Sequence, residues 1–411
     1  MENGKKHPAL VLDTSTATGL SVVRNLGRRG VPVTTMDFFE SKFGISRYVD
    51  QAFIVPHYKK EEDLFLQYIL DYAQGFEKKP VLFFTDPAYL GFLYKHFDLL
   101  KEYFLFPLED KKGLTYFLDR SLLRKTLVDQ GVRLPASIQG RDPALKERVL
   151  DELGYPCLLR SYREDWLEDL LGPSPLLLED EGALLGAMAK LRGQEDRYFV
   201  QALVDGPDSK VYYLSAYYGA KGVLRGLSSS QALRLSPKGF GQASYLQQKW
   251  IPDALPLIQP FFQALKWRGF VEATFKRDEF SSQLYLLDIR PSFSPYNALL
   301  CDLGFEAPYM YYLDALGQVP PSQILNQTSH RYWKDLFLDL SASWSYLRSR
   351  EMSLIEILSS YNFTKSSSIF AFDDLGPGLA YLSSALMEGA SRARQQVVDL
   401  CKEKKYHLQE K

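Results

Sequence analysis

Two carboxylates lie inside apolar segments in the second half of the chain. Glu272 falls within the run Phe270 to Lys276, and Asp288 within the run Gln283 to Ile289. Aromatic and aliphatic residues fill both runs, and the polar segment DEFSS separates them, which predicts a hairpin of two adjacent strands. Because burying an unpaired carboxylate is costly, we expect a cation to lie between these side chains.

Two kinds of cation could meet this need. Arg290 lies two residues beyond Asp288, so both side chains emerge on the same face of the second strand. A structural ion pair would then neutralise the carboxylate. The alternative is magnesium, whose preferred oxygen ligands include carboxylates and nucleotide phosphates. The hairpin alone leaves both alternatives open.

The composition excludes several classes of protein. A chain of 411 residues is too long for one ordinary core and is expected to form about two or three packed units. Its 49 basic and 50 acidic residues nearly cancel, so no overall field would gather nucleic acid or an anionic membrane. No apolar run suits a signal peptide or a membrane span, and three dispersed cysteines indicate neither a disulfide framework nor a zinc site. We therefore predict a soluble, cytoplasmic protein that binds no nucleic acid.

The first 117 residues are expected to form one of these units. PALVLD at 8–13 predicts a strand, the next segment predicts a helix that ends at Gly30, and VPVTTMD at 31–37 predicts a second strand. This β-α-β opening is typical of a parallel, Rossmann-like sheet, with a further strand expected at Phe104 to Leu108. A dinucleotide site is not indicated, because DTSTATG lacks the glycine pattern that lets the backbone approach a pyrophosphate.

Several segments after residue 117 follow one another in a recognisable order. Arg120 lies near the start of the amphipathic helical segment FLDRSLLRKTLVDQGVRLPAS, which Asp119 also belongs to, and Arg160 is the charged residue of the strand YPCLLRS. Gln201 lies in YFVQALVDG and Arg234 in ALRLSPKGFGQAS, ahead of the hairpin with its Gly-x-x-Glu and Leu-Asp-Ile-x-Pro motifs. This succession resembles the ATP-grasp superfamily, and is most similar to its D-aspartate ligase branch of carboxylate-amine ligases.

The resemblance implies a role for each of these residues. Glu272 and Asp288 would hold magnesium, and Arg120 and Arg160 replace the lysines that contact nucleotide phosphates in the family. The adenine-binding strand would be formed by Gln201, Ala202 and Leu203. The two catalytic residues would be Arg234 and Arg290.

Departures from the family pattern bear on the catalytic positions. Arg290 stands where the family has asparagine, and Ser292 where it has arginine. Arg290 would bind the reacting carboxylate or acylphosphate, or it would repel or replace magnesium. Arg234 would bind phosphate or substrate, unless it is a solvated strand arginine. The segment SYREDWLEDLLGPSP, which is a glycine-rich flap in many relatives, holds the single glycine Gly172.

The resemblance implies an α/β and α+β architecture of three parts. A Rossmann-like domain, residues 1–117, precedes an ATP-grasp region, residues 118–320, and a helical and mixed extension, residues 321–411, packs on that region. The implied activity is an ATP-dependent ligase that joins a carboxylate to an amine through an acylphosphate, with ATP and Mg²⁺ as cofactors. The implied partners are small-molecule carboxylates and amines, such as amino acids, peptides or a cell-wall precursor, and a second copy in a homodimer. The departures leave a second hypothesis open, a catalytically degenerate ATP-grasp protein that binds a nucleotide or metabolite or serves as a partner subunit.

Overall fold

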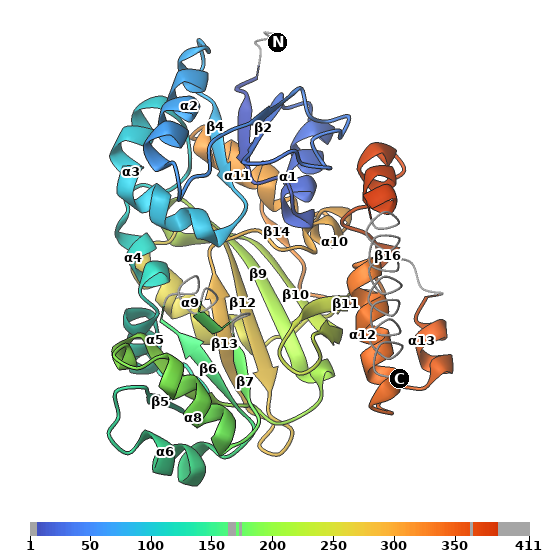
Figure 1. Cartoon of the computed structure of the whole chain (residues 1–411). Coiled ribbons are helices and arrows are strands. Elements are labelled where there is room, and N and C mark those ends of the chain that lie inside the picture. The colour runs from blue at the N-terminus through green and yellow to red at the C-terminus, as the bar shows by residue number, and fades with distance from the viewer. Residues whose placement is uncertain (1–5, 163–169, 172–174, 362–364, 385–411) are drawn as a thin grey trace, which may run out of the picture.

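The structure is a computed structural model that describes residues 6–162, 170–171, 175–361 and 365–384. Figure 1 shows the blue N-terminal unit at the top, a large sheet in the centre, a smaller green unit at the lower left and orange C-terminal helices at the right. Most of the expected flap segment, including Gly172, lies outside the described residues, as do the closing residues 385–411.

The N-terminal unit is built on a parallel sheet, as predicted, and its strand order is β3-β2-β1-β4. Alternate residues of its central strand enter different cores: Leu10 packs with the helices α2 and α3, and Val11 packs with α1. A strand buried on both faces explains the continuous apolar run PALVL. The strand predicted at Phe104 to Leu108 is wrong, because only Leu105 forms an isolated bridge to Val81. The elements are β1 Ala9–Leu12, α1 Ala17–Arg28, β2 Val33–Asp37, β3 Gln51–Ile54, α2 Glu62–Gln74, β4 Val81–Phe84, α3 Leu90–Tyr103 and α4 Lys112–Leu118.

The large sheet is mostly antiparallel, in the order β13-β12-β9-β10-β11-β15-β16, with β14 beside β10. Its edge strand β13 forms the predicted hairpin with β12, and the register sets Glu272 opposite Arg290 and Thr274 opposite Asp288. Because cross-strand partners share a face, these four side chains emerge on one side of the sheet. The strands are β9 Val211–Gly219, β10 Val223–Ser236, β11 Gln242–Gln248, β12 Gly269–Arg277, β13 Leu284–Arg290, β14 Gln323–Ile324, β15 Tyr332–Lys334 and β16 Lys365–Ser366.

The green unit, called here the small lobe, is an antiparallel sheet in the order β5-β8-β6-β7 with its helices. Its apolar residues form a core of their own, which includes Val149, Leu159, Leu184 and Val200. Its elements are β5 Ser137–Gln139, α6 Leu145–Arg148, the π-helix η2 Val149–Leu153, β6 Cys157–Ser161, β7 Leu176–Leu178, α8 Glu181–Lys190 and β8 Tyr198–Ala202.

The remaining helices connect and cover these sheets. The C-terminal part reaches back to the N-terminal unit, where Arg24 of α1 donates to Asp374 at 2.8 Å and both side chains are buried. No helix in the described ranges is long and apolar enough to cross a membrane. These helices are α5 Arg120–Asp129, α9 Ala254–Leu265, α10 Asn297–Asp302, α11 Ala307–Ala315, α12 Leu336–Arg348 and α13 Leu354–Ser359.

Candidate functional site

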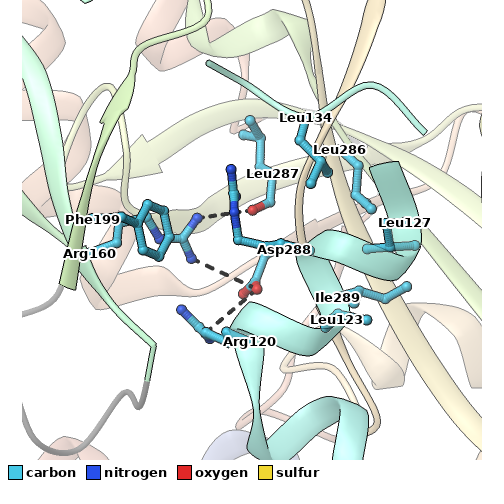
Figure 2. Close-up of a pocket in the computed structure, with 11 residues that line it drawn as sticks. Arg120, Leu123, Leu127, Leu134, Arg160, Phe199, Leu286, Leu287, Asp288 and Ile289 are labelled. Carbon is cyan, nitrogen blue, oxygen red and sulfur yellow. Dashed lines mark hydrogen bonds and ion pairs between the residues drawn. The ribbon is translucent and has the colours of Figure 1, made fainter. Parts of the chain in front are cut away.

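A pocket that is open to solvent lies where α5, the small lobe and the edge strand β13 meet (Figure 2). Its charged lining residues are three arginines and one aspartate, and the rest of the lining is apolar. The pocket therefore combines an apolar wall with a cationic one. The lining residues are Arg120, Leu123, Arg124, Leu127, Leu134, Arg160, Phe199, Leu286, Leu287, Asp288 and Ile289.

Helix α5 brings two arginines to this pocket. The carboxylate of Asp119 caps the helix by accepting from the backbone N–H groups of Ser121 at 2.9 Å and Leu122 at 3.1 Å, so α5 begins at Arg120. Arg124 follows four residues later and therefore lies on the same face of the helix. Arg124 was not predicted as a site residue, although its i, i+4 spacing from Arg120 was available to identify it.

The guanidinium of Arg124 is held by the small lobe. It donates to the hydroxyl of Ser137 at 2.8 Å, lies 3.4 Å from the side-chain oxygen of Gln201 and stacks over the ring of Phe199 at 4.6 Å. Burial lowers the pKa of Arg124 to about 10, and the nearby charge of Arg120 acts in the same direction.

Strand β6 supplies Arg160, which bridges the small lobe and the large sheet. It donates to the backbone carbonyl of Leu287 at 2.9 Å, and its Nη2 lies 3.8 Å from Oδ1 of Asp288. Its Nε is buried without a hydrogen-bond partner among the described residues. Burial lowers the pKa of Arg160 to about 10, and repulsion by Arg120 contributes. This arginine therefore carries a charge that the surrounding residues only partly compensate.

Asp288 is the counter-charge for several arginines. Figure 2 shows Arg120 and Arg160 reaching its carboxylate from α5 and β6, with nitrogen–oxygen distances of 3.6 and 3.8 Å. Arg290 donates to its other oxygen at 2.7 Å. Burial alone would raise the pKa of Asp288, but these three guanidinium groups outweigh it and hold the pKa well below its ordinary value. Among the described lining residues of the pocket, three arginines meet one carboxylate, and such a lining would suit a polyanion such as a polyphosphate.

Glu272 differs from Asp288 in its partners. It accepts hydrogen bonds from the hydroxyls of Ser294 and Tyr296, and burial raises its pKa. The register places Glu272 and Asp288 diagonally on one face of the hairpin, a separation of about 7–8 Å in antiparallel pairs. No group of three or more potential His, Cys, Asp or Glu metal ligands occurs in the described part of the chain. A hard cation would therefore need phosphate oxygens besides these carboxylates, which is a donor set that Mg²⁺ accepts.

The predicted adenine-binding residues lie at the end of β8, beside the pocket. Gln201 is 2% exposed and meets the pocket through Arg124. The backbone N–H of Ala202 donates to Ala136 at 2.9 Å, and Leu203 follows the strand end, half-buried. Their proposed contact with adenine stays a prediction.

Arg234 does not reach this pocket. Its guanidinium is buried and donates to both oxygens of Asp339 at 2.8 Å and to the hydroxyl of Ser360 at 3.0 Å, while it stacks over Tyr245. Irregular pairing of β10 with β11 on both sides of Arg234 accompanies this placement, and such bulges re-aim side chains. Arg234 thus has a structural ion-pair partner, Asp339, whereas the resemblance implied a catalytic role for this arginine. Because its guanidinium is buried, Arg234 is not a solvated strand arginine.

Solved structures with a similar fold include enzymes that were determined with nucleotide. An N5-carboxyaminoimidazole synthetase from Staphylococcus aureus, complexed with ADP, matches with a TM-score of 0.56 and 14% identity over 79% of this chain and 81% of that one. The biotin carboxylase domain of the Hydrogenobacter thermophilus 2-oxoglutarate carboxylase, in complex with MgADP, ADP and bicarbonate, gives 0.59 and 14% over 80% and 73%. The protein has the ATP-grasp fold.

This fold is shared with an L-amino acid ligase from Bacillus licheniformis, which matches with a TM-score of 0.55 and 12% identity over 76% of this chain and 75% of that one. No family model and no curated protein matches the chain. The predicted ATP-grasp fold, preceded by a Rossmann-like sheet, is thus confirmed. At these identities the likeness concerns the fold, and function must be argued from the site.

Proposed function

We propose that the protein is an ATP-dependent ligase that joins a carboxylate to an amine. The observation that carries this proposal is the cluster of guanidinium groups around Asp288, in a pocket between the small lobe and the large sheet. The nucleotide complexes of structures with the same fold support a nucleotide as the polyanion. The three-part division at residues 117 and 320 and a cytoplasmic location belong to the same proposal.

The nucleotide would lie with its phosphates on the cationic wall. Arg120 and Arg160 would bind phosphate oxygens, and the fork of a guanidinium suits such pairing. Arg124 stands beside them and orders Gln201, next to which Ala202 and Leu203 would border the adenine. Glu272 and Asp288 would hold Mg²⁺, which supplies charge neutralisation at the phosphate oxygens. The apolar lining would exclude water from the reacting groups.

The reaction would proceed in two balanced steps. An oxygen of the substrate carboxylate attacks the terminal phosphorus of ATP and forms an acylphosphate. The bond between this phosphorus and the bridging oxygen breaks, and ADP leaves. The amine then attacks the acyl carbon, phosphate leaves, and the nitrogen loses a proton to give the amide. Catalysis of this kind depends mainly on positioning and charge stabilisation, which is what a set of fixed arginines offers. Arg290 would contact the acylphosphate from the hairpin.

Amino acids and short peptides are the proposed substrate class. The L-amino acid ligase with the same fold supports amino acids or peptides, and the sequence resemblance to D-aspartate ligases points to an amino acid donor, with a cell-wall precursor as one acceptor. The proposed partners of the protein are small molecules and a second copy of the chain.

A catalytically degenerate protein is the second candidate. The observation that favours it is the 2.7 Å pair between Arg290 and Asp288, which engages a proposed metal ligand.

Nucleotide binding and turnover are tested together. Calorimetric titration with a non-hydrolysable ATP analogue and Mg²⁺ should detect binding in the wild type, and Arg120→Ala should weaken it about 10- to 100-fold, the value of a charged hydrogen bond. Arg148→Ala is the matched control, because this half-exposed arginine of the small lobe pairs with Asp142 and Glu152 away from the pocket.

Release of ADP is then measured with pairs drawn from amino acids and short peptides. Stimulation by one carboxylate–amine pair supports the ligase. Tight binding without stimulated ADP release across the panel would favour the degenerate protein, and absence of binding in a folded sample would overturn both.

A further inference from the structure

Arg124 differs from the other arginines that line the pocket in the partners of its charge. Arg120 and Arg160 both lie near the carboxylate of Asp288, at 3.6 and 3.8 Å. Arg124 lines the same pocket, but no carboxylate of the described residues forms an ion pair with it. Within the described part of the chain, its charge therefore lacks the kind of partner that the other two share.

Neutral groups hold the guanidinium of Arg124 in place. Its Nη2 donates to the hydroxyl of Ser137 at 2.8 Å and to the carbonyl oxygen of Pro135 at 3.4 Å, and its Nη1 lies 3.4 Å from Oε1 of Gln201. The guanidinium carbon lies 4.6 Å from the ring centre of Phe199. Its Nε makes no hydrogen bond with the described residues. These contacts orient the guanidinium without cancelling its charge.

A partly buried cation of this kind is costly unless a counter-charge is supplied. Burial lowers the pKa of Arg124 to about 10, and the nearby charge of Arg120 acts in the same direction. The two arginines are four residues apart on α5, a spacing that places their Cβ atoms about 5–6 Å apart on one face of a helix. An anion bound at this face would be attracted by both guanidinium groups and would offset their mutual repulsion.

We propose that Arg124 is a phosphate-binding residue of the nucleotide site, where the phosphate supplies the counter-charge that the described residues do not. This inference rests on the proposed nucleotide function and adds a third arginine to Arg120 and Arg160. A guanidinium carries five N–H donors. Arg124 can therefore donate to a phosphate oxygen through Nε while Nη1 and Nη2 keep their contacts with the small lobe.

Calorimetric titration with ADP and Mg²⁺ tests this role. Arg124→Gln should bind ADP about 10- to 100-fold more weakly than the wild type, because a charged hydrogen bond is lost. Arg124→Lys keeps the charge but loses the fork, and its affinity should fall between the two. Arg141→Gln is the matched control, because this exposed arginine of the small lobe donates to Gln139 at 2.8 Å and lies outside the pocket lining. Its affinity should equal that of the wild type.

Two further measurements separate phosphate binding from a structural role. Tripolyphosphate, which has neither base nor ribose, should compete with ADP for the wild type, and Arg124→Gln should weaken its binding by about the same factor as that of ADP. Ser137→Ala removes a neutral acceptor of Arg124 and leaves the charge in place, so it should weaken ADP binding only about 2- to 10-fold. This second variant decides the question if Arg124→Gln does not fold.

The possible outcomes distinguish the inference from the function on which it rests. Equal ADP affinity in the wild type and in folded Arg124→Gln would overturn the inference and leave the nucleotide site intact. A loss of ADP affinity without a loss of tripolyphosphate affinity, or no competition by tripolyphosphate in the wild type, would also overturn it. If urea denaturation shows a loss of stability while ADP affinity is unchanged, Arg124 is structural only. If the folded wild type binds no ADP with or without Mg²⁺, the proposed function fails and the inference falls with it.

Discussion

Two clusters of cations around an aspartate occur in this protein, and they differ in what completes them. In the closed cluster, Arg234 and Lys334 share Asp339, and none of the three side chains is more than 4% exposed. Tyrosine rings cover the cations, with the ammonium of Lys334 3.3 Å from the ring centre of Tyr361 and 4.2 Å from that of Tyr245. Cation–π contacts and hydroxyls thus complete the closed cluster from within the chain.

The pocket cluster gathers Arg120, Arg160 and Arg290 around Asp288, and their side chains are between 11% and 46% exposed. It borders a pocket, whereas tyrosine rings cover the closed cluster. Among the described residues, both clusters carry more positive than negative charge. The difference teaches that an excess of arginine is better evidence for a proposed ligand site where the cluster borders a pocket than where buried side chains enclose it.

The largest expected effect is on the closed cluster. Asp339→Ala would leave Arg234 and Lys334 buried without their carboxylate, and loss of one partner from a buried ion pair costs about 3–5 kcal/mol. Urea denaturation should show this loss of unfolding free energy. Asp98→Ala serves as the control, because Asp98 is 84% exposed in its pair with Lys111. A loss below about 1 kcal/mol would contradict the structural role of this cluster.

A smaller effect of a different kind is expected in the pocket cluster. Arg160→Ala should weaken nucleotide binding by about 1.5–3 kcal/mol, the value of a charged hydrogen bond, while it changes stability little. The reason is that burial and Arg120 already disfavour the charge of Arg160, as its lowered pKa of about 10 indicates. Titration calorimetry with ADP and urea denaturation separate the two quantities. The comparison fails if stability falls as far as in Asp339→Ala.

The closed cluster should also make stability depend on pH. Burial opposes ionisation of Asp339, but Arg234 and Lys334 outweigh it, so its pKa is lower in the folded protein. A carboxyl with a lowered folded pKa stabilises the fold above its unfolded pKa, and this contribution is lost as the pH falls through the folded value. The stability difference between wild type and Asp339→Asn should be full at pH 7 and begin to shrink below about pH 4, the ordinary range of aspartate. A difference that stays constant down to pH 2 would contradict the assignment.

The smallest effect is expected where arginine and aspartate meet in solvent. Arg28 pairs with Asp373 at 2.7 Å, and the two side chains are 38% and 41% exposed. Exposed pairs of this kind contribute about 0.2–1 kcal/mol. Arg28→Ala should therefore lower the unfolding free energy by no more than that, in the same urea assay, whereas Arg24→Ala, which removes the buried partner of Asp374, should cost several times as much. Equal effects would show that burial does not set the scale.

The sequence predicted the elements that follow from local patterns. The hairpin of β12 and β13 and the buried run of β1 were readable, because a residue's face in a strand depends only on its position. A common site for Arg120, Arg160 and Asp288 was implied by the resemblance to ATP-grasp proteins, and all three line one pocket. Arg124 was equally readable from its spacing and was overlooked.

Other features depend on contacts that no local pattern records. Arg234 sits in a motif position, but an irregularity in strand pairing and the arrival of Asp339, 105 residues later, decide where its guanidinium lies. The helix expected to run through Asp119 divides there, because the carboxylate caps α5 and ends α4. Tyr296 and Ser294 contact Glu272 across a turn, a contact that depends on the path of the chain after β13.

The separate core of the small lobe has a consequence for motion. Because its apolar residues pack with one another, the lobe can move away from the large sheet without opening its own core. Polar contacts such as those of Arg160 with Leu287 and Asp288 must break in such a movement. An anion that binds both walls of the pocket would resist it. Hydrogen exchange in the lobe and in β13 should then slow together when an anion binds in the pocket. The arginines would in that case hold the lobe against the large sheet with a strength that depends on the bound anion.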